Sequence, residues 1–82
     1  MKFEVTKYTI KDRVVYPIRI KLANKRKSKW YWISDYDANN KSIEVVFGSV
    51  LDWFSWEDSA IKKAEHLKTV WKRGELKIRF LQ

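Results

Sequence analysis

The sequence predicts a small α+β domain, in which an antiparallel sheet of about five strands is covered on one face by a single amphipathic helix. Several segments alternate apolar and polar residues with the period of two that half-buried strands show, and one segment has apolar residues at helical spacing. A chain of 82 residues with 45% hydrophobic side chains is long enough for one thin sheet-and-helix core. The expected order of elements is ββββαβ, in a single domain over residues 1–82.

The first two strands are expected within residues 3–10 and 13–22. In the first, the phase of the apolar alternation changes near Thr6 and Lys7, which indicates a bulge. Pro17 lacks an N–H group, so the second strand should lie at a sheet edge or contain a bulge at that residue. The predicted apolar face of the second strand comprises Val14, Tyr16, Ile18, Ile20 and Leu22.

The third and fourth strands are predicted to form a hairpin. Residues 30–36 carry large side chains on both faces, as expected for a central strand. Residues 37–41 have the Asp and Asn composition of a turn, and the alternating residues 43–47 follow it. Alternation places Trp30, Trp32 and Tyr36 on one face of the third strand and Tyr31 and Ile33 on the other. The sequence leaves open which of these two faces is in the core.

The helix is expected from about Trp56 to Arg73. Ser55 and Asp58 have capping-box spacing, and Gly74 stands where a helix usually ends. The predicted buried stripe comprises Trp56, Ala60, Ala64, Leu67 and Trp71. A final strand is predicted where Leu76, Ile78 and Phe80 alternate with Lys77 and Arg79.

The chain is strongly basic, with 18 Lys and Arg against 10 Asp and Glu and a net charge of +8. A net positive charge of this size attracts polyanions. Nucleic acid is the first expectation, although an acidic protein would be attracted in the same way. The basic run at residues 25–29 falls where the second strand should reverse into the third. Its cations can reach phosphates beyond the sheet edge, or they can simply form a solvated loop. The helix cations are interpreted as the solvated side of an amphipathic helix.

Aromatic side chains beside cations suit the stacking of single-stranded bases. Because one helix covers only one sheet face, aromatic residues of the third strand are candidates for this role, with burial in the core as the alternative. The predicted nucleic-acid-binding residues are Arg19, Lys21, Lys25, Arg26, Lys27, Lys29, Trp30 and Trp32.

Catalysis and cofactor binding are not expected. The absence of Cys excludes disulfides and thiolate sites, and a single His excludes a metal site built from imidazoles. Asp35, Asp37 and Glu44 are candidate ligands of Mg²⁺, but no basic residue follows them at the spacing of a nuclease motif. His66 is a candidate catalytic imidazole, but the sequence offers no matched Ser or acid for it. A small basic nuclease is the remote alternative. No apolar run approaches a membrane span and no signal-peptide pattern is present, so a cytoplasmic protein without membrane association is expected.

Three strands and a helix between Arg13 and Lys72, entered through the sequence WFSWEDSA at 53–60, are similar in order to the arm-type DNA-binding domains of phage and transposon integrases. The resemblance implies a three-stranded sheet in the major groove, although the extra first and last strands depart from it and no binding residue is transferred. The alternative function is a phage-type or mobile-element accessory or inhibitor protein that docks a protein partner through exposed Trp and Tyr. A homodimer through the uncovered face, or through an edge at Pro17, is also compatible.

Overall fold

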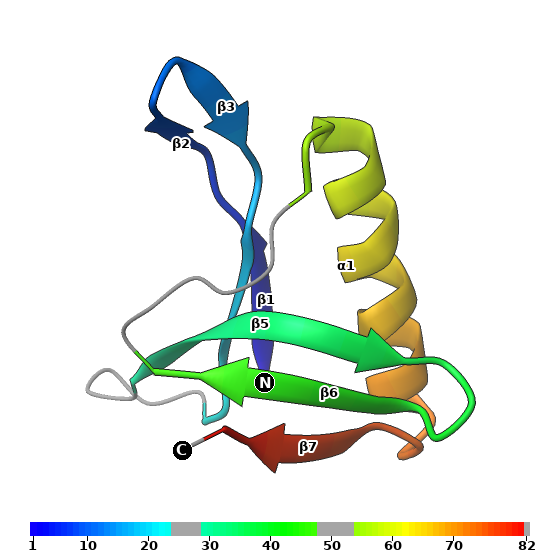
Figure 1. Ribbon diagram of the computed structural model, residues 1–82. Helices are drawn as coiled ribbons and strands as arrows, with labels where there is room; N and C mark the ends of the chain where they lie inside the picture. Colours follow the sequence, from blue (N-terminus) through cyan, green and yellow to red (C-terminus); the bar gives the residue numbers. More distant parts are fainter. Residues whose placement is uncertain (24–28, 48–53, 82) are drawn as a thin grey trace.

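The computed structural model describes residues 1–23, 29–47 and 54–81, and these confirm the α+β class. They form one helix and a five-stranded sheet, together with a separate two-stranded sheet (Figure 1). The elements are β1 (Lys2–Val5), β2 (Tyr8–Ile10), β3 (Arg13–Val15), β4 (Ile18–Lys21), β5 (Trp30–Asp37), β6 (Ser42–Val46), α1 (Glu57–Lys72) and β7 (Lys77–Phe80).

The large sheet has the strand order β1-β4-β5-β6-β7, with β5 in the centre as expected. The pairs β1–β4, β4–β5 and β5–β6 are antiparallel. The prediction of a wholly antiparallel sheet is wrong at one edge, because β7 pairs parallel to β6. The chain between these two strands contains α1, and a crossover of this kind returns the chain to the same end of the sheet, from which the next strand runs in the same direction.

The first four strands form a single bent hairpin, in which β1 pairs with β4 and β2 with β3. At the bend, the backbone N–H and the hydroxyl of Thr6 both donate to the carbonyl oxygen of Pro17, at 3.0 and 2.8 Å. The N–H of Tyr16 donates instead to the carbonyl oxygen of Phe54 at 2.8 Å, outside the hairpin. The predicted irregularity near Thr6 and Pro17 is therefore present, but it is not the expected bulge. Val5 pairs with Ile18 and Tyr8 with Val15, so two residues of each strand span the break and the register is unchanged.

This bend also changes which side chains of the second predicted strand are buried. Ile18 and Ile20 are in the core as predicted, whereas Val15 and Pro17 are buried and Val14 is exposed. The predicted apolar face therefore holds in β4 and is wrong in β3. Because the strand is interrupted at Pro17, odd-numbered residues face the core before the break and even-numbered residues face it after the break.

Helix α1 runs close to the predicted range, and Gly74 follows it with a φ of 71°, a conformation that glycine adopts without steric penalty. The predicted cap at Ser55 is wrong: the N-cap residue is Trp56, and it makes no side-chain capping hydrogen bond. The predicted stripe is also wrong at both ends, because Trp56 is 74% exposed and Trp71 is 37% exposed. The buried helix residues are Ala60, Ala64, Leu67 and Val70.

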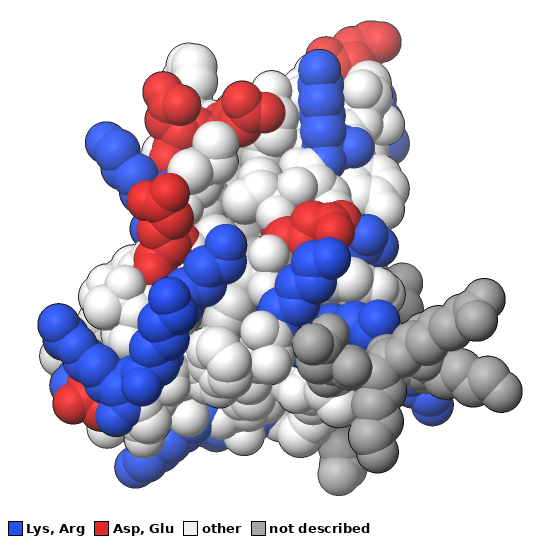
Figure 2. Space-filling view, turned by 180° about the vertical axis from the view of Figure 1, so that it is seen from behind, with Lys and Arg blue, Asp and Glu red and all other residues white. Residues whose placement is uncertain are grey.

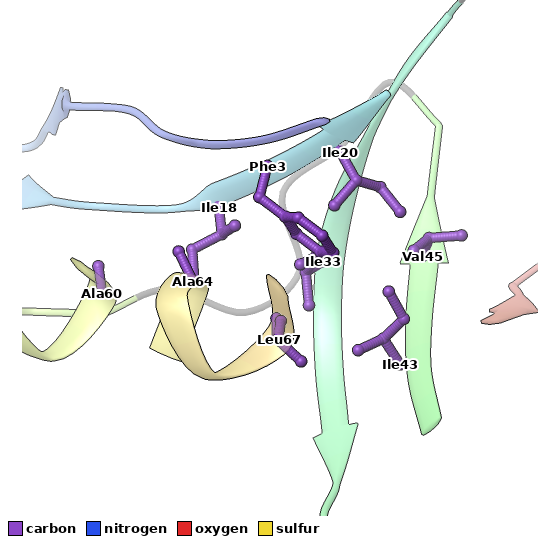
Figure 3. Packing of buried hydrophobic residues seen from close by; sticks show 9 residues of the cluster. All are labelled: Phe3, Ile18, Ile20, Ile33, Ile43, Val45, Ala60, Ala64 and Leu67. Atoms are coloured by element: carbon purple, nitrogen blue, oxygen red, sulfur yellow. The ribbon is translucent and has the colours of Figure 1, made fainter. Parts of the chain in front are cut away.

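The core lies between α1 and one face of the sheet (Figure 3). The small side chains of Ala60 and Ala64 let the helix backbone approach the strands closely. Figure 3 shows the side chains that meet there, namely Phe3, Ile18, Ile20, Ile33, Ile43, Val45, Ala60, Ala64 and Leu67. Since Ile33 belongs to this cluster, the face of β5 that carries Ile33 is the core face.

A bulge in β5 alters the alternation after Ile33. Ile33 pairs with Val45 and Tyr36 pairs with Ile43, so three steps along β5 match only two steps along β6. In a regular strand, residues three apart would point to opposite faces. Tyr36 therefore joins the core side, where it packs against the cluster. The prediction that Tyr36 shares a face with Trp30 and Trp32 is wrong, because the extra residue of a bulge reverses the phase of the strand after it.

A candidate nucleic-acid interface on the open sheet face

The face of the sheet opposite α1 carries Trp30 and Trp32, and we call it the open face. Tyr31 pairs with the buried Ile20 and lies on the core side, so its two neighbours in β5 point the other way. The register places Arg19 opposite Trp32 and Lys21 opposite Trp30, and therefore on the same face. Two of the predicted cations and two of the predicted aromatic residues thus lie on one face of the sheet, a choice of face that the sequence left open.

Three cations surround the ring of Trp30. The guanidinium carbon of Arg19 lies 4.2 Å from the ring centroid, and the Nζ atoms of Lys21 and Lys2 lie 5.8 and 6.0 Å from it. Lys2 reaches this position from β1, where it pairs with Lys21. Distances up to about 6 Å allow attraction between a cation and an indole ring. We call these four residues the Trp30 cluster.

Arg19 is also held by a carboxylate, which distinguishes it from the two lysines. Its Nε donates to Oε1 of Glu4 at 2.9 Å, and its Nη2 donates to the same oxygen at 2.5 Å. The side chains of Arg19 and Glu4 are 30% and 35% exposed, so this pair is partly shielded from water. Within the described part of the chain, Lys2 and Lys21 have no carboxylate at ion-pair distance. Arg19 therefore orients the cluster, whereas the two ammonium groups can bind an anion.

Trp32 extends the aromatic surface towards the bent hairpin. Its ring meets the ring of Tyr8 edge to face, with 5.5 Å between centroids and an interplanar angle of 78°. Tyr8 lies in β2 and remains exposed. Tyr8 and Lys2 are not among the site residues predicted from the sequence. The change of phase near Thr6 signalled the bend, but only the register of β1 with β4 places Lys2 beside Trp30.

The remaining predicted binding residues are not part of the cluster. The Nζ of Lys29 lies 5.2 Å from the ring centroid of Phe47, whose ring contacts Tyr31 on the core side of the sheet. Lys25, Arg26 and Lys27 lie outside the described residues.

The described cations of α1 are exposed, except Lys63, which is half-buried beside Tyr36. Figure 2, seen from the side opposite to Figure 1, shows positive side chains spread over that face with acidic side chains among them. This distribution agrees with the interpretation of the helix cations as a solvated surface.

The three carboxylates of the candidate Mg²⁺ site each bind another group of the chain. Oδ1 of Asp37 accepts the N–H groups of Asn39 and Asn40 at 3.0 and 3.3 Å, and its Oδ2 accepts Nδ2 of Asn40 at 2.6 Å. The hydrogen bonds from Asn40, chiefly that of its side chain, lower the pKa of Asp37 below its ordinary value. Asp35 accepts the N–H of Tyr36, and Glu44 faces Arg79 at 3.6 Å. The described residues contain no group of three side chains suited to hold a metal ion.

His66 pairs with an aromatic hydroxyl. Its Nε2 lies 3.0 Å from the hydroxyl of Tyr36, with the two rings edge to face. Lys63 lies 4.7 Å from the ring centroid of Tyr36. Beside them is a shallow pocket of about 140 Å³, lined by Ile33, Asp35, Tyr36, Phe54 and Lys63. His66 thus orients Tyr36 rather than forming the imidazole–carboxylate pair that general acid–base catalysis commonly uses.

No helix in the described part of the chain is both long enough and apolar enough to cross a membrane. No protein-family model, curated protein or solved structure matches the chain significantly. The similarity to integrase arm-type domains therefore rests on the order of elements and on the short sequence at 53–60.

Proposed function

We propose that the protein binds nucleic acid through its open face. The observation that carries this proposal is the Trp30 cluster, in which one half-buried indole is surrounded by Lys2, Lys21 and the anchored Arg19. The two lysines offer ammonium groups to phosphate oxygens, and the net charge of +8 attracts a polyanion to the whole molecule.

Single-stranded nucleic acid suits this surface best. Trp30 and Trp32 lie on neighbouring positions of the open face, and both remain partly accessible. Stacking of a base on an aromatic side chain contributes about 1–3 kcal/mol and tolerates any base sequence. In the sequence, Lys25, Arg26 and Lys27 fall between Lys21 and Trp30, and the proposal includes them on their charge alone.

The test is a salt titration of binding to a labelled oligothymidylate, followed by fluorescence anisotropy. For the double variant K2A/K21A we expect weaker binding and a slope of log K against log salt that is shallower by about 1.4, because two phosphate contacts are lost. The matched control is K62A/K68A, which removes two exposed charges from α1. Equal losses in the two double variants, or no oligonucleotide binding by the parent protein at low salt, would contradict the proposal.

Docking of a protein partner is a second candidate function, favoured by a different observation. Phe47 and Phe80 are 60% and 55% exposed, on the α1 side of the sheet and away from the Trp30 cluster. Large exposed aromatic side chains are typical anchors of protein interfaces. A stoichiometric protein that co-purifies after nuclease treatment and is lost in the F80S variant would support this function. Loss of every partner on nuclease treatment would contradict it.

A further inference from the structure

Strand β7 forms one edge of the sheet, and no strand in the described part of the chain pairs with its outer side (Figure 1). The N–H of Lys77 donates to the carbonyl oxygen of Lys41, and that of Leu81 to the carbonyl oxygen of Val45, both at 2.9 Å. Backbone groups of alternate residues point to the same side of a strand, so the N–H and C=O groups of Ile78 and Phe80 point away from β6. These groups are available to pair with an added strand.

The two faces of this edge carry different kinds of side chain, and the face on the open side of the sheet is basic. Lys77 and Arg79 are out of phase with Ile78, which packs against the core, so they point to the open face. The side chain of Arg79 is 65% exposed and lies 3.6 Å from Glu44. Lys77 is exposed, and no described carboxylate lies at ion-pair distance from it. A strand added here would therefore bring alternate side chains beside two cations.

The other face of the same edge is aromatic. The ring of Phe80 meets that of Tyr31 edge to face at 5.4 Å, and the ring of Phe47 meets Tyr31 at 5.8 Å. We call these three residues the edge aromatic group. Two of its members are more than half exposed, so it offers apolar area that a partner can remove from water.

We propose that β7 is the docking site for an extended segment of a protein partner in which acidic and apolar residues alternate. The segment would continue the sheet by pairing with Ile78 and Phe80. Its apolar side chains would pack on the edge aromatic group, and its acidic side chains would lie opposite Lys77 and Arg79. Opposite charges on neighbouring strands stabilise the pairing, and alternation lets one short segment satisfy both faces.

A second copy of the chain is a poorer occupant of this edge. Two copies of β7 that pair antiparallel through both Ile78 and Phe80 place Arg79 of one copy directly opposite Arg79 of the other, with Lys77 on the same face diagonal to it. Like charges on directly opposed residues destabilise strand pairing, and basic residues on an edge strand are a common protection against self-association. The charges that disfavour a second copy therefore favour an acidic strand.

The test uses synthetic peptides of about six residues, the usual length of a strand. Three peptides alternate Glu with Val, Lys with Val, and Glu with Ser, and each is titrated into the isotope-labelled protein. We expect the Glu–Val peptide to bind most tightly, and to slow hydrogen exchange at the amides of Ile78 and Phe80 by roughly tenfold, equivalent to about 1.4 kcal/mol. Sedimentation measured in parallel should show a monomer.

Two exposed positions separate charge from apolar packing. The variant K77E should weaken the Glu–Val peptide by several-fold and strengthen the Lys–Val peptide, whereas F80S should weaken both. The control K62E reverses a charge on α1 and should change neither affinity. The proposal is overturned if the Glu–Val peptide does not bind, if the Lys–Val peptide binds equally well, if the perturbed amides lie in β4 and β5 instead, or if the protein dimerises through β7. None of these outcomes depends on oligonucleotide binding by the open face.

Discussion

Arg19 lies over the ring of Trp30, with its guanidinium carbon 4.2 Å from the ring centroid, while Glu4 accepts two hydrogen bonds from the same guanidinium. Because one side chain is held by both an indole and a carboxylate, the cluster has a fixed arrangement before any ligand arrives. A preorganised site loses less conformational freedom on binding, which favours affinity. The same carboxylate offsets one positive charge of the surface that we propose for nucleic acid.

The variant Glu4→Gln tests this balance. It removes a negative charge beside the Trp30 cluster and leaves an amide that can still accept from Arg19, so we expect oligonucleotide binding to tighten several-fold at low salt. The effect on stability should be small, because a partly exposed ion pair contributes about 0–1 kcal/mol. Anisotropy titrations and thermal unfolding measure the two effects. Unchanged affinity at low salt would show that Glu4 does not face the bound ligand.

The helix offers a direct comparison of burial with side-chain size. Leu67 is fully buried, so we expect Leu67→Ala to lower the free energy of unfolding by about 2–5 kcal/mol. Trp56 is much larger but 74% exposed, and we expect Trp56→Ala to change stability by only about 0.5 kcal/mol. Urea unfolding followed by circular dichroism measures both. Comparable losses in the two variants would mean that Trp56 packs into the core, as its spacing alone predicts.

Acid should weaken the turn between β5 and β6. Hydrogen bonds from Asn40 lower the pKa of Asp37, and the hydrogen bond from Lys41 lowers the pKa of Glu75. A folded-state pKa below the unfolded value gives stability that is present above the unfolded pKa and is lost as the pH falls through the folded pKa. Stability should therefore decline below about pH 4, the ordinary range of these carboxyl groups.

The double variant Asp37→Asn with Glu75→Gln should lose less stability than the parent between neutral pH and about pH 3, since neither group titrates any longer. Urea midpoints measured across this range give the comparison. A control variant Glu57→Gln, at an exposed position of the first helical turn, should retain the acid sensitivity that comes from Asp37 and Glu75. Identical pH profiles for the parent and the double variant would contradict the assignment.

Gly74 should be required for its backbone conformation rather than for its size. Its φ is 71°, and a Cβ atom built there would meet nothing within 4 Å. We expect Gly74→Ala to lower the free energy of unfolding by about 1–2 kcal/mol, the usual penalty for a side chain in the left-handed region. Gly74→Asn should lose less, because Asn tolerates this conformation better. Equal losses for both variants would contradict this conformational explanation.

The sequence alone determined the type and approximate limits of most elements. The turn at 37–41, the end of the helix before Gly74 and the central strand at 30–36 follow from residues that are neighbours in the chain. Turn chemistry, capping and alternation act over a few residues, so they can be recognised without knowing the fold. The net charge of +8, and with it the attraction to polyanions, is likewise a property of composition.

Tertiary structure decided which side chains face one another. The bulge after Ile33 turns Tyr36 towards the core, and the register of β1 with β4 brings Lys2 to Trp30. The parallel direction of β7 follows from the path of the chain through α1 and not from its own residues. Alternation gives a strand two faces, but the assignment of one face to the core depends on partners distant in sequence. The Trp30 cluster draws residues from three strands, and for that physical reason the sequence contained its members without showing their arrangement.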